Sequence, residues 1–241
     1  MISVRTKLYF SMENLILQQF FVFTFPERHD KMCSYLYFSF LRGQTMDSNF
    51  FALISRMRYI ARWGLMRNAL PENIQEHSHM VAVLAHALGV IRRDIFHQPC
   101  DVNALATAAL YHDASEILTG DLPTPIKYHN AEIMSAYHAV EDLAVQKLLG
   151  MLPPELRETY AAVLDEDKDG DIYPLVKAAD KLSAYIKCIE ERKAGNNEFL
   201  SAEAQTRAAL EASPLPEVQY FLEHFIPAFE RDLDELGAIG Q

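Results

Sequence analysis

Three observations on this sequence predict an all-α fold. From Met46 onward, apolar residues recur three and four positions apart, which is the spacing of one helix face. No stretch shows the alternation of β-branched and polar residues that is typical of a half-buried strand. Half of the 241 residues are apolar, which is enough for a large core. Because no repeat or linker divides the sequence, we expect a single-domain helical bundle.

Ordinary start and stop signals delimit the first two helices. The segment NFFALISRMRYI, residues 49–60, predicts a helix that ends before Gly64. Asn73 is a good N-cap with Glu76 three residues later, so a second helix is expected over 74–92. Its apolar stripe consists of Met80, Leu84, Leu88 and Ile91.

The third and fourth helices carry similar signals. Asp101 or Asn103 caps the third helix, which is expected to run to about Leu118 and to stop at Gly120. The fourth helix is expected over about 130–149, where the sequence GMLPPE ends it.

The rest of the chain continues the helical pattern. Two prolines open a short helix over 153–164, and the sequence DEDKDGD at 165–171 predicts a solvated loop. A long helix is expected over 172–193, followed by two more at about 201–212 and 216–236. The apolar stripe of the long helix consists of Leu175, Ala179, Leu182, Ile186 and Ile189.

Residues 1–45 differ from the rest and are expected to be an atypical N-terminal extension. They hold ten Phe and Tyr residues, and five Lys/Arg against three Asp/Glu give them a formal charge of +2. Their apolar run at 15–25 contains two Gln and is shorter than the roughly 20 residues of a membrane span. We therefore expect the domain to occupy 46–241, with Met46 as the natural start.

Charge and cysteine content narrow the functional classes. The formal charge of −11 argues against a surface for polymeric nucleic acid or anionic membrane, because both favour clustered Lys and Arg. A small phosphorylated ligand needs only one or two local cations and stays compatible with this charge. The three cysteines, Cys33, Cys100 and Cys188, have no CxxC spacing, which fits reduced thiols in a cytoplasmic protein.

Polar residues lie where the helical pattern predicts burial in the sequence YHDASE. His112 lies seven residues after Leu105 and therefore on the same helix face, and Glu116 lies four residues further along. Asp113 is turned from His112 by about 100°. An ionised carboxylate in such a position is costly unless it is paired or coordinates a metal.

Two other predicted helices offer side chains of the same kind, namely His77 in EHSHM and Asp180 in AADKLSAY. With His112 and Asp113 they would present two imidazoles and two carboxylates to one divalent ion. Such a donor set suits Mn, Co, Fe, Ni or Zn. Composition alone does not select these four residues. Surface or structural roles are expected for His79, His86, His97, His129, His138 and His224.

The segments EHS, YHDASE and AADKLSAY resemble the H…HD…D pattern of the HD-domain phosphohydrolase superfamily. Three further segments, RWGLMRN, HDASEILTGDLPTPIKY and KAGNNEF, are similar to bacterial 5′-deoxynucleotidases of the YfbR type. The resemblance runs from about Met46 to the final helix. The N-terminal extension and the loop near 165–171 are the places where the sequence departs from the pattern. The implied fold is a helical bundle of the HD-domain type.

The resemblance also implies site residues. The metal ligands would be His77, His112, Asp113 and Asp180. Arg62 would orient the phosphate, Trp63 would contact the substrate, and Glu116 would act in catalysis. Substrate contacts are implied for Arg62, Trp63, His77, Asp113, Asp121, Leu122, Pro123, Thr124 and Asp180. Glu116 as a helix cap and Trp63 as a core anchor stay open as structural alternatives.

The expected activity is hydrolysis of deoxynucleoside 5′-monophosphates to deoxynucleoside and phosphate, by attack of a water bound to one divalent ion, Co or Mn or a similar metal. Glu116 would transfer a proton, and Arg62 would donate two parallel hydrogen bonds to the phosphate. Trp63 beside C2′ would exclude a ribose hydroxyl. The similar proteins suggest a homodimer, and the segment VQYFLEHFIPAFERDL offers either an interface or a core face.

Two other readings stay open. The alternative within the superfamily is another HD-domain phosphohydrolase, such as a nucleoside triphosphohydrolase or a phosphodiesterase. A single ligand quartet favours one metal, and the lack of a Lys/Arg cluster around the motifs disfavours a triphosphate. From a different class, a non-catalytic nucleotide-sensing module would keep the ligands but would not need Arg62 and Glu116.

Overall fold

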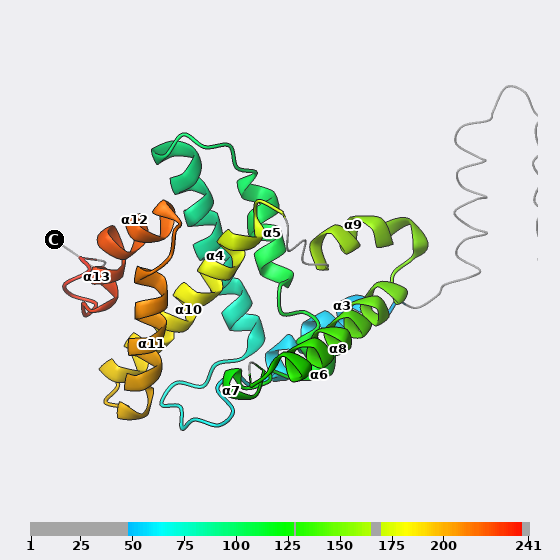
Figure 1. Cartoon of the computed structure of the whole chain (residues 1–241), viewed down its shortest axis with the longest axis horizontal. Helices are drawn as coiled ribbons and strands as arrows, with labels where there is room; N and C mark the ends of the chain where they lie inside the picture. Colours follow the sequence, from blue (N-terminus) through cyan, green and yellow to red (C-terminus); the bar gives the residue numbers. More distant parts are fainter. Residues whose placement is uncertain (1–47, 128, 165–169, 238–241) are drawn as a thin grey trace, which may run out of the picture. The chain divides into compact units, whose positions relative to one another are not determined.

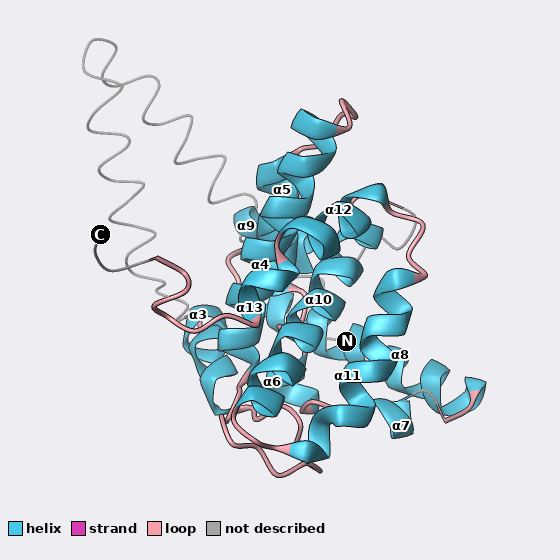
Figure 2. Cartoon of the chain, turned by 90° about the vertical axis from the view of Figure 1, so that its left-hand side faces the viewer, coloured by secondary structure: helices cyan, strands magenta, loops and turns pink. Residues whose placement is uncertain are grey.

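The computed structural model describes residues 48–127, 129–164 and 170–237, except the side chains of Thr124 and Pro125. The predicted extension at 1–45 and most of the predicted loop at 165–171 therefore lie outside the described residues. Every regular element in these ranges is helical, which confirms the predicted all-α fold (Figure 2). None of the helices described is long and apolar enough to cross a membrane.

The helices follow one another in the order drawn in Figure 1. The α-helices are α3 (Phe50–Ile54), α4 (Ile74–Val90), α5 (Val102–Tyr111), α6 (Glu116–Thr119), α7 (Thr124–Lys127), α8 (Ala131–Gly150), α9 (Pro154–Leu164), α10 (Tyr173–Lys193), α11 (Leu200–Glu211), α12 (Pro216–His224) and α13 (Ile226–Phe229). Three short turns of tighter or wider helix are η1 (Ser55–Tyr59), η2 (Ile91–Ile95) and η3 (Asn197–Phe199).

Side chains cap three of the helices at their N-termini. Asn73 Oδ1 accepts hydrogen bonds from the backbone amides of Gln75 and Glu76, each at 3.1 Å. Asp101 caps α5 in the same way, so it is Asp101 rather than Asn103 that starts this helix. Asn130 caps α8. Each cap satisfies amides that have no partner inside the helix, which typically stabilises it by about 1 kcal/mol.

The main core lies between α4, α5 and α10 (Figure 1). The predicted stripe on α10 is buried throughout, and Leu182 belongs to the same cluster as Leu88 of α4 and Leu105 of α5. Gly89 allows the close approach of α4 to α5, because a Cβ at this position would lie 3.0 Å from Leu105 Cδ2. Val218, Phe221 and Ile226 of the C-terminal segment also belong to this core.

A second apolar cluster joins α3, α8 and α9 to the chain segment that follows α5. Phe50 is fully buried and packs edge-on against Tyr160, with ring centroids 5.0 Å apart. Ala114 is fully buried in this cluster, whereas Ala109, five residues earlier, belongs to the main core. The segment 110–113 therefore crosses from one core to the other.

Two predicted helices are interrupted. The third does not run to Leu118, because α5 ends at Tyr111 and residues 112–115 form a turn before α6. The backbone amide of Glu116 bonds to Asp113 O, three residues back, which is tighter than α-helical spacing. The last helix breaks at Phe225, because Pro227 has no N–H to continue it. Gly120 ends α6 with a φ of 75°, as predicted.

The connection between η1 and α4 has no regular structure, but it is tied down at both ends. An isolated bridge pairs Ala61 with Asn73 at its base. At its tip, the fully buried Glu191 carboxylate accepts from the amides of Ala69, at 2.8 Å, and Leu70, at 3.0 Å. Lys187, one turn earlier on α10, bonds both this carboxylate and Leu70 O. Two charges on α10 thus hold the loop.

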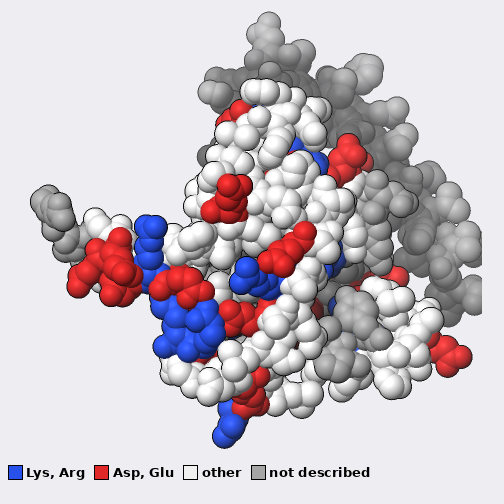
Figure 3. Space-filling model, turned by 60° about the vertical axis from the view of Figure 1, so that its left-hand side comes forward, with Lys and Arg blue, Asp and Glu red and all other residues white. Residues whose placement is uncertain are grey.

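On one face of the molecule, side chains of opposite charge lie next to one another. On the face drawn in Figure 3, Lys and Arg lie next to Asp and Glu. Ion pairs also link α10 to neighbouring segments. Arg192 of α10 pairs with Glu203 at 2.9 Å and with Glu230 at 2.5 Å.

We predict that Glu191→Ala lowers the free energy of unfolding by about 3–5 kcal/mol, because it leaves Lys187 buried without its counter-charge. Burial alone would raise the pKa of Glu191, but hydrogen bonds from Lys187, the two loop amides and Asn196 lower it from 4.5 to about 2. The stabilisation is therefore complete above about pH 4.5 and is lost as the pH falls towards 2. Urea unfolding between pH 7 and pH 3.5 checks both points. Glu190→Ala, at the exposed neighbouring position, is the control, and equal losses in both variants would contradict the prediction.

Candidate active site

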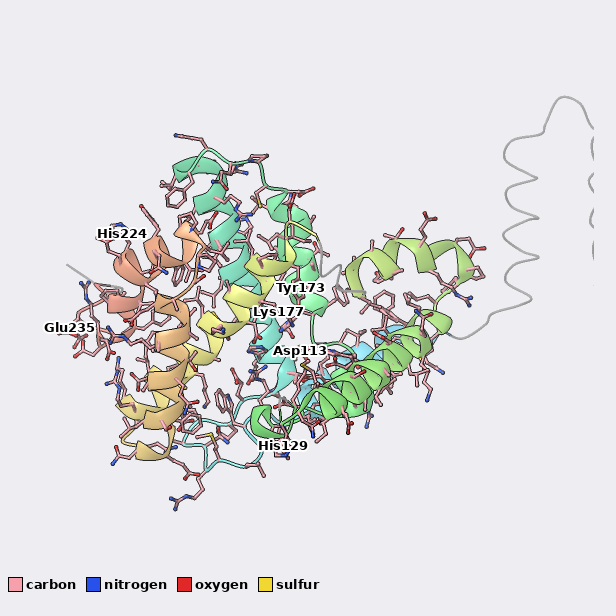
Figure 4. The ribbon with its side chains drawn as sticks, viewed as in Figure 1. Asp113, His129, Tyr173, Lys177, His224 and Glu235 are labelled. Atoms are coloured by element: carbon pink, nitrogen blue, oxygen red, sulfur yellow. The ribbon has the colours of Figure 1, made fainter. Side chains whose placement is uncertain are left out.

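The structure brings together side chains from three separate segments. His77 lies in the first turn of α4, His112 and Asp113 lie in the turn after α5, and Asp180 lies in the middle of α10. His77 Nε2 is 3.0 Å from Asp180 Oδ1 and 3.5 Å from Asp113 Oδ2. His112 Nε2 is 3.2 Å from the same Asp113 oxygen. In Figure 4, Asp113 lies where the chain leaves α5 and passes α4 and α10.

The second nitrogen of each histidine is held by a hydrogen bond. His112 Nδ1 lies 2.7 Å from the carbonyl oxygen of Ala109, which can only accept, so this nitrogen carries the proton. His77 Nδ1 lies 3.2 Å from Ser183 Oγ on α10. The Nε2 atoms of both rings are buried without a hydrogen-bond partner among the described residues. Such an arrangement is typical of histidines whose free nitrogen binds a metal ion.

The spacing of these atoms fits a shared ion. Donor atoms of His77, His112 and Asp180 all lie within 4.8 Å of one another. Two donors that bind one ion at about 2.0–2.2 Å lie about 3 Å apart, as His77 and Asp180 do here. Asp113 falls outside this group of three but contacts both histidines through one oxygen. Two imidazoles with carboxylates form a donor set suited to a divalent metal ion.

Opposite charges keep both carboxylates ionised. Burial would raise the pKa of Asp113, but the charge of the neighbouring His112 imidazole, with the charges of His77 and Arg62, holds it well below its usual range. For Asp180, burial is likewise outweighed by the neighbouring His77 imidazole, 3.0 Å away, and by the charge of His112, and its pKa is lowered. The two carboxylates are therefore charged at neutral pH, as metal ligands must be.

Arg62 and Trp63 lie beside this cluster. Arg62 Nη1 donates to Asp113 Oδ2 at 3.3 Å, and its side chain is only 13% exposed. Burial lowers the pKa of the guanidinium, but the carboxylates of Asp113, Asp180 and Glu72 raise it above its usual value. The Trp63 ring packs against Phe199, with centroids 5.2 Å apart. The structure thus places Arg62 next to the predicted metal ligands.

Glu116 is buried close to the cluster, with Oε2 unpaired among the described groups. Burial, followed by the negative charges of Asp113 and Asp121, raises its pKa to about 10. A Glu that only capped a helix at the surface would be ionised at pH 7. Glu116 is instead buried, protonated at this pH and has one oxygen without a partner among the described residues, which is unusual for a residue with a purely structural role. The arrangement suits a proton donor or acceptor.

The loop after Gly120 continues from Glu116 along the same side. Asp121, Leu122 and Pro123 are half-buried, and Thr124 begins α7, although its side chain lies outside the described part. Burial raises the pKa of Asp121, and the charge of Arg62 opposes this shift. Asp121 therefore lies within electrostatic reach of Arg62. The histidines for which surface or structural roles were expected lie on the surface or, like His138, pair with a neighbouring carboxylate.

The chain is similar to a known protein family over most of its length. Residues 49–229 match the family model described as 5′-deoxynucleotidase YfbR-like. A curated relative named 5′-deoxynucleotidase YfbR, from Shigella boydii, is 51% identical over 192 residues, which cover 79% of this chain and 96% of the relative. Its namesake from Escherichia coli (strain ATCC 8739) is 50% identical over the same shares.

The chain belongs to the 5′-deoxynucleotidase YfbR-like family. Among solved structures, an HD-domain phosphohydrolase from Listeria innocua superimposes with a TM-score of 0.68. It is 24% identical, and the match covers 77% of this chain and 90% of that one. This likeness confirms the helical bundle of the HD-domain type.

Two residues in contact with the site of this YfbR-like protein were not expected. Ser183 holds His77, and Glu72 binds both Arg62 and Trp63. Ser183 lies three residues after Asp180 on α10, a helical spacing that pointed to the same face. Glu72 gave no comparable signal, because the irregular chain before it has no periodicity.

We predict that metal-stripped full-length protein gains thermal stability when Co²⁺ or Mn²⁺ is added, because an ion that binds only the folded state raises Tm. Asp180→Asn and His112→Ala are expected to lose most of this rise. His86→Ala, an exposed histidine on the same helix as His77, should keep it. Thermal unfolding with and without metal measures the effect. A full rise in Asp180→Asn would contradict the ligand assignment.

We also predict that Glu116→Gln separates stability from activity. Because the pKa of Glu116 is raised from 4.5 to about 10, keeping its carboxyl group folded costs stability increasingly as the pH rises through this interval. The metal-free Gln variant should therefore equal or exceed the parent in Tm at pH 8.5, with no advantage near pH 4.5. Its phosphatase activity should fall at least about 100-fold. A Gln variant less stable than the parent at pH 8.5 would show that Glu116 serves the fold instead.

Proposed function

We propose that this protein hydrolyses deoxynucleoside 5′-monophosphates to deoxynucleoside and phosphate. The observation that carries the proposal is the contact between Arg62 and Asp113, at 3.3 Å, within a site suited to a divalent ion. Membership of the 5′-deoxynucleotidase YfbR-like family, with about half of the residues identical to named relatives, supports the substrate class.

The roles of the side chains follow from their chemistry. His77, His112, Asp113 and Asp180 would hold the ion, which supplies Lewis-acid activation of water and neutralises phosphoryl charge. Arg62 offers a planar guanidinium whose remaining N–H groups suit two phosphate oxygens. Glu116, protonated at neutral pH, is fit to give a proton to the leaving 5′ oxygen and to recover one from the attacking water.

Selection for the deoxy sugar is assigned to Trp63 and the loop at Asp121–Thr124. Trp63 has a φ of 57°, in the left-handed region that a bulky residue rarely adopts, so its backbone conformation is enforced by its surroundings. We propose that the ring lies beside C2′ and leaves no room for a ribose hydroxyl. Asp121, Leu122, Pro123 and Thr124 would contact the sugar and base.

Four narrower assignments complete the proposal. We propose Co or Mn as an effective ion, because mixed nitrogen and oxygen donors suit both. A cytoplasmic location is supported by Cys100 and Cys188, which form no disulfide. A homodimer is supported by exposed apolar side chains on α8, Val140 and Leu143. The segment VQYFLEHFIPAFERDL gives weaker support, since Val218, Phe221 and Ile226 lie in the core.

We predict metal-dependent release of free phosphate from deoxynucleoside 5′-monophosphates and at least about tenfold slower release from the ribonucleotides. The test is a panel of deoxy- and ribonucleoside mono- and triphosphates, given to stripped protein with Co²⁺ or Mn²⁺. Release from triphosphates alone would favour a triphosphohydrolase, and no release at all would favour a nucleotide-sensing module. Equal rates on deoxy- and ribonucleotides would remove the steric role of Trp63.

We further propose that residues 46–241 form the phosphohydrolase domain and that residues 1–45 are dispensable for it. Support comes from the family match, which begins at residue 49. A version that starts at Met46 is expected to keep the Tm and the phosphate release of the full chain. Loss of either in the shorter version would contradict this assignment.

A further inference from the structure

Glu72 has no role in the catalytic scheme above, yet its carboxylate contacts two side chains of the site, Arg62 and Trp63. It lies just before Asn73, the N-cap of α4, and its side chain is 15% exposed. Its Oε2 accepts one hydrogen bond from Arg62 Nε at 3.2 Å and another from Trp63 Nε1 at 3.0 Å. Its Oε1 lies 4.0 Å from His77 Nδ1.

One carboxylate oxygen therefore joins the side chains of two consecutive residues. The backbone reinforces this link, because the amide of Arg62 donates to Glu72 O at 3.0 Å. The bridge between Ala61 and Asn73 flanks the pair on the other side. Trp63 keeps a left-handed backbone conformation, which persists only where the surroundings enforce it. Glu72 supplies an enforcing contact from the side chain.

The contact also decides which donors of Arg62 are available. A guanidinium has five N–H groups in a fixed plane. Glu72 takes the Nε donor, and Asp113 accepts from Nη1 at 3.3 Å. The remaining N–H groups of the plane are then fixed in direction, because the plane is held at two of its nitrogen atoms. The Trp63 ring is fixed relative to that plane through the same Glu72 oxygen.

We propose that Glu72 is a positioning residue that sets the specificity of the enzyme for the deoxy sugar. It locks the phosphate-binding group, Arg62, and the sugar-facing ring, Trp63, into one rigid unit. The distance from the bound phosphate to the Trp63 ring is thereby fixed, so a ribose 2′-hydroxyl meets the ring instead of displacing it. This inference rests on the proposed function, in which Arg62 binds phosphate and Trp63 faces the sugar.

The test compares Glu72→Gln and Glu72→Ala with Glu76→Gln, a control at an exposed position in the first turn of the same helix. For each full-length variant, kcat and KM are measured with matched deoxy- and ribonucleoside monophosphates in Co²⁺ or Mn²⁺. Loss of a charge-assisted hydrogen bond is expected to lower the deoxy-to-ribo ratio of kcat/KM about tenfold or more, mainly through KM. Glu76→Gln is expected to keep the parent ratio.

A second readout separates positioning from metal binding. Because Glu72 lies near His77, the Tm rise on adding Co²⁺ or Mn²⁺ is measured in the same variants. The inference expects this rise to be unchanged. Its loss in Glu72→Gln would overturn the inference, since Glu72 would then act through the metal ligand. An unchanged deoxy-to-ribo ratio, with both substrates slowed equally, would overturn it as well.

Trp63→Phe keeps the inference falsifiable if the Glu72 variants fail to fold. Phe retains an aromatic ring but removes the Nε1 donor, so the deoxy-to-ribo ratio is expected to fall as in Glu72→Gln. A ratio equal to that of the parent would overturn the role of the hydrogen bond. Failure of the parent protein to release phosphate from any deoxymonophosphate is a different result, because it refutes the proposed function itself.

Discussion

The ionised carboxylate of Asp113 is the interaction on which the rest of the site depends. One of its oxygens lies within 3.5 Å of Arg62, His77 and His112, three groups that carry or can carry positive charge. A buried carboxylate without such partners would be too costly to keep charged. The partners come from the loop after η1, from α4 and from the turn after α5. These three segments must therefore pack close together for Asp113 to stay ionised.

The fold meets this constraint by anchoring the turn between two cores. Ala109 packs in the core of α4, α5 and α10, and Ala114 packs in the cluster under α3, α8 and α9. His112 and Asp113 both lie in this turn, and His112 Nε2 is 3.2 Å from Asp113 Oδ2. The same break starts α6 with Glu116, whose buried carboxyl group remains protonated.

The structural features that depend on neighbouring residues in the sequence were predictable, and those that depend on tertiary contacts were not. The cap at Asn73 and the buried stripe of α10 were predictable because they follow from short-range spacing. The break after Tyr111 was not, because the small residues there are compatible with a helix. The charged run around Glu191 looks like a solvated helix end in the sequence. The burial of Glu191 depends on a loop more than 100 residues earlier, whose amide at Ala69 donates to its carboxylate.

The candidate site divides in the same way. The resemblance to HD-domain proteins pointed to His77, His112, Asp113 and Asp180, and the structure brings them together. Glu72 was not predictable, because its two contacts require a left-handed residue at Trp63. No periodic pattern encodes that conformation. The contacts that Glu72 makes with Arg62 and Trp63 therefore lie outside the motifs that predict the metal ligands.

The most direct test of the central claim is X-ray absorption at the cobalt edge of Co²⁺-loaded full-length protein. We predict one bound ion with two imidazole ligands and oxygen ligands, and one imidazole fewer in His112→Ala. His86→Ala should give the spectrum of the parent. A cobalt ion without imidazole ligands, or a His112→Ala spectrum identical to that of the parent, would contradict the account.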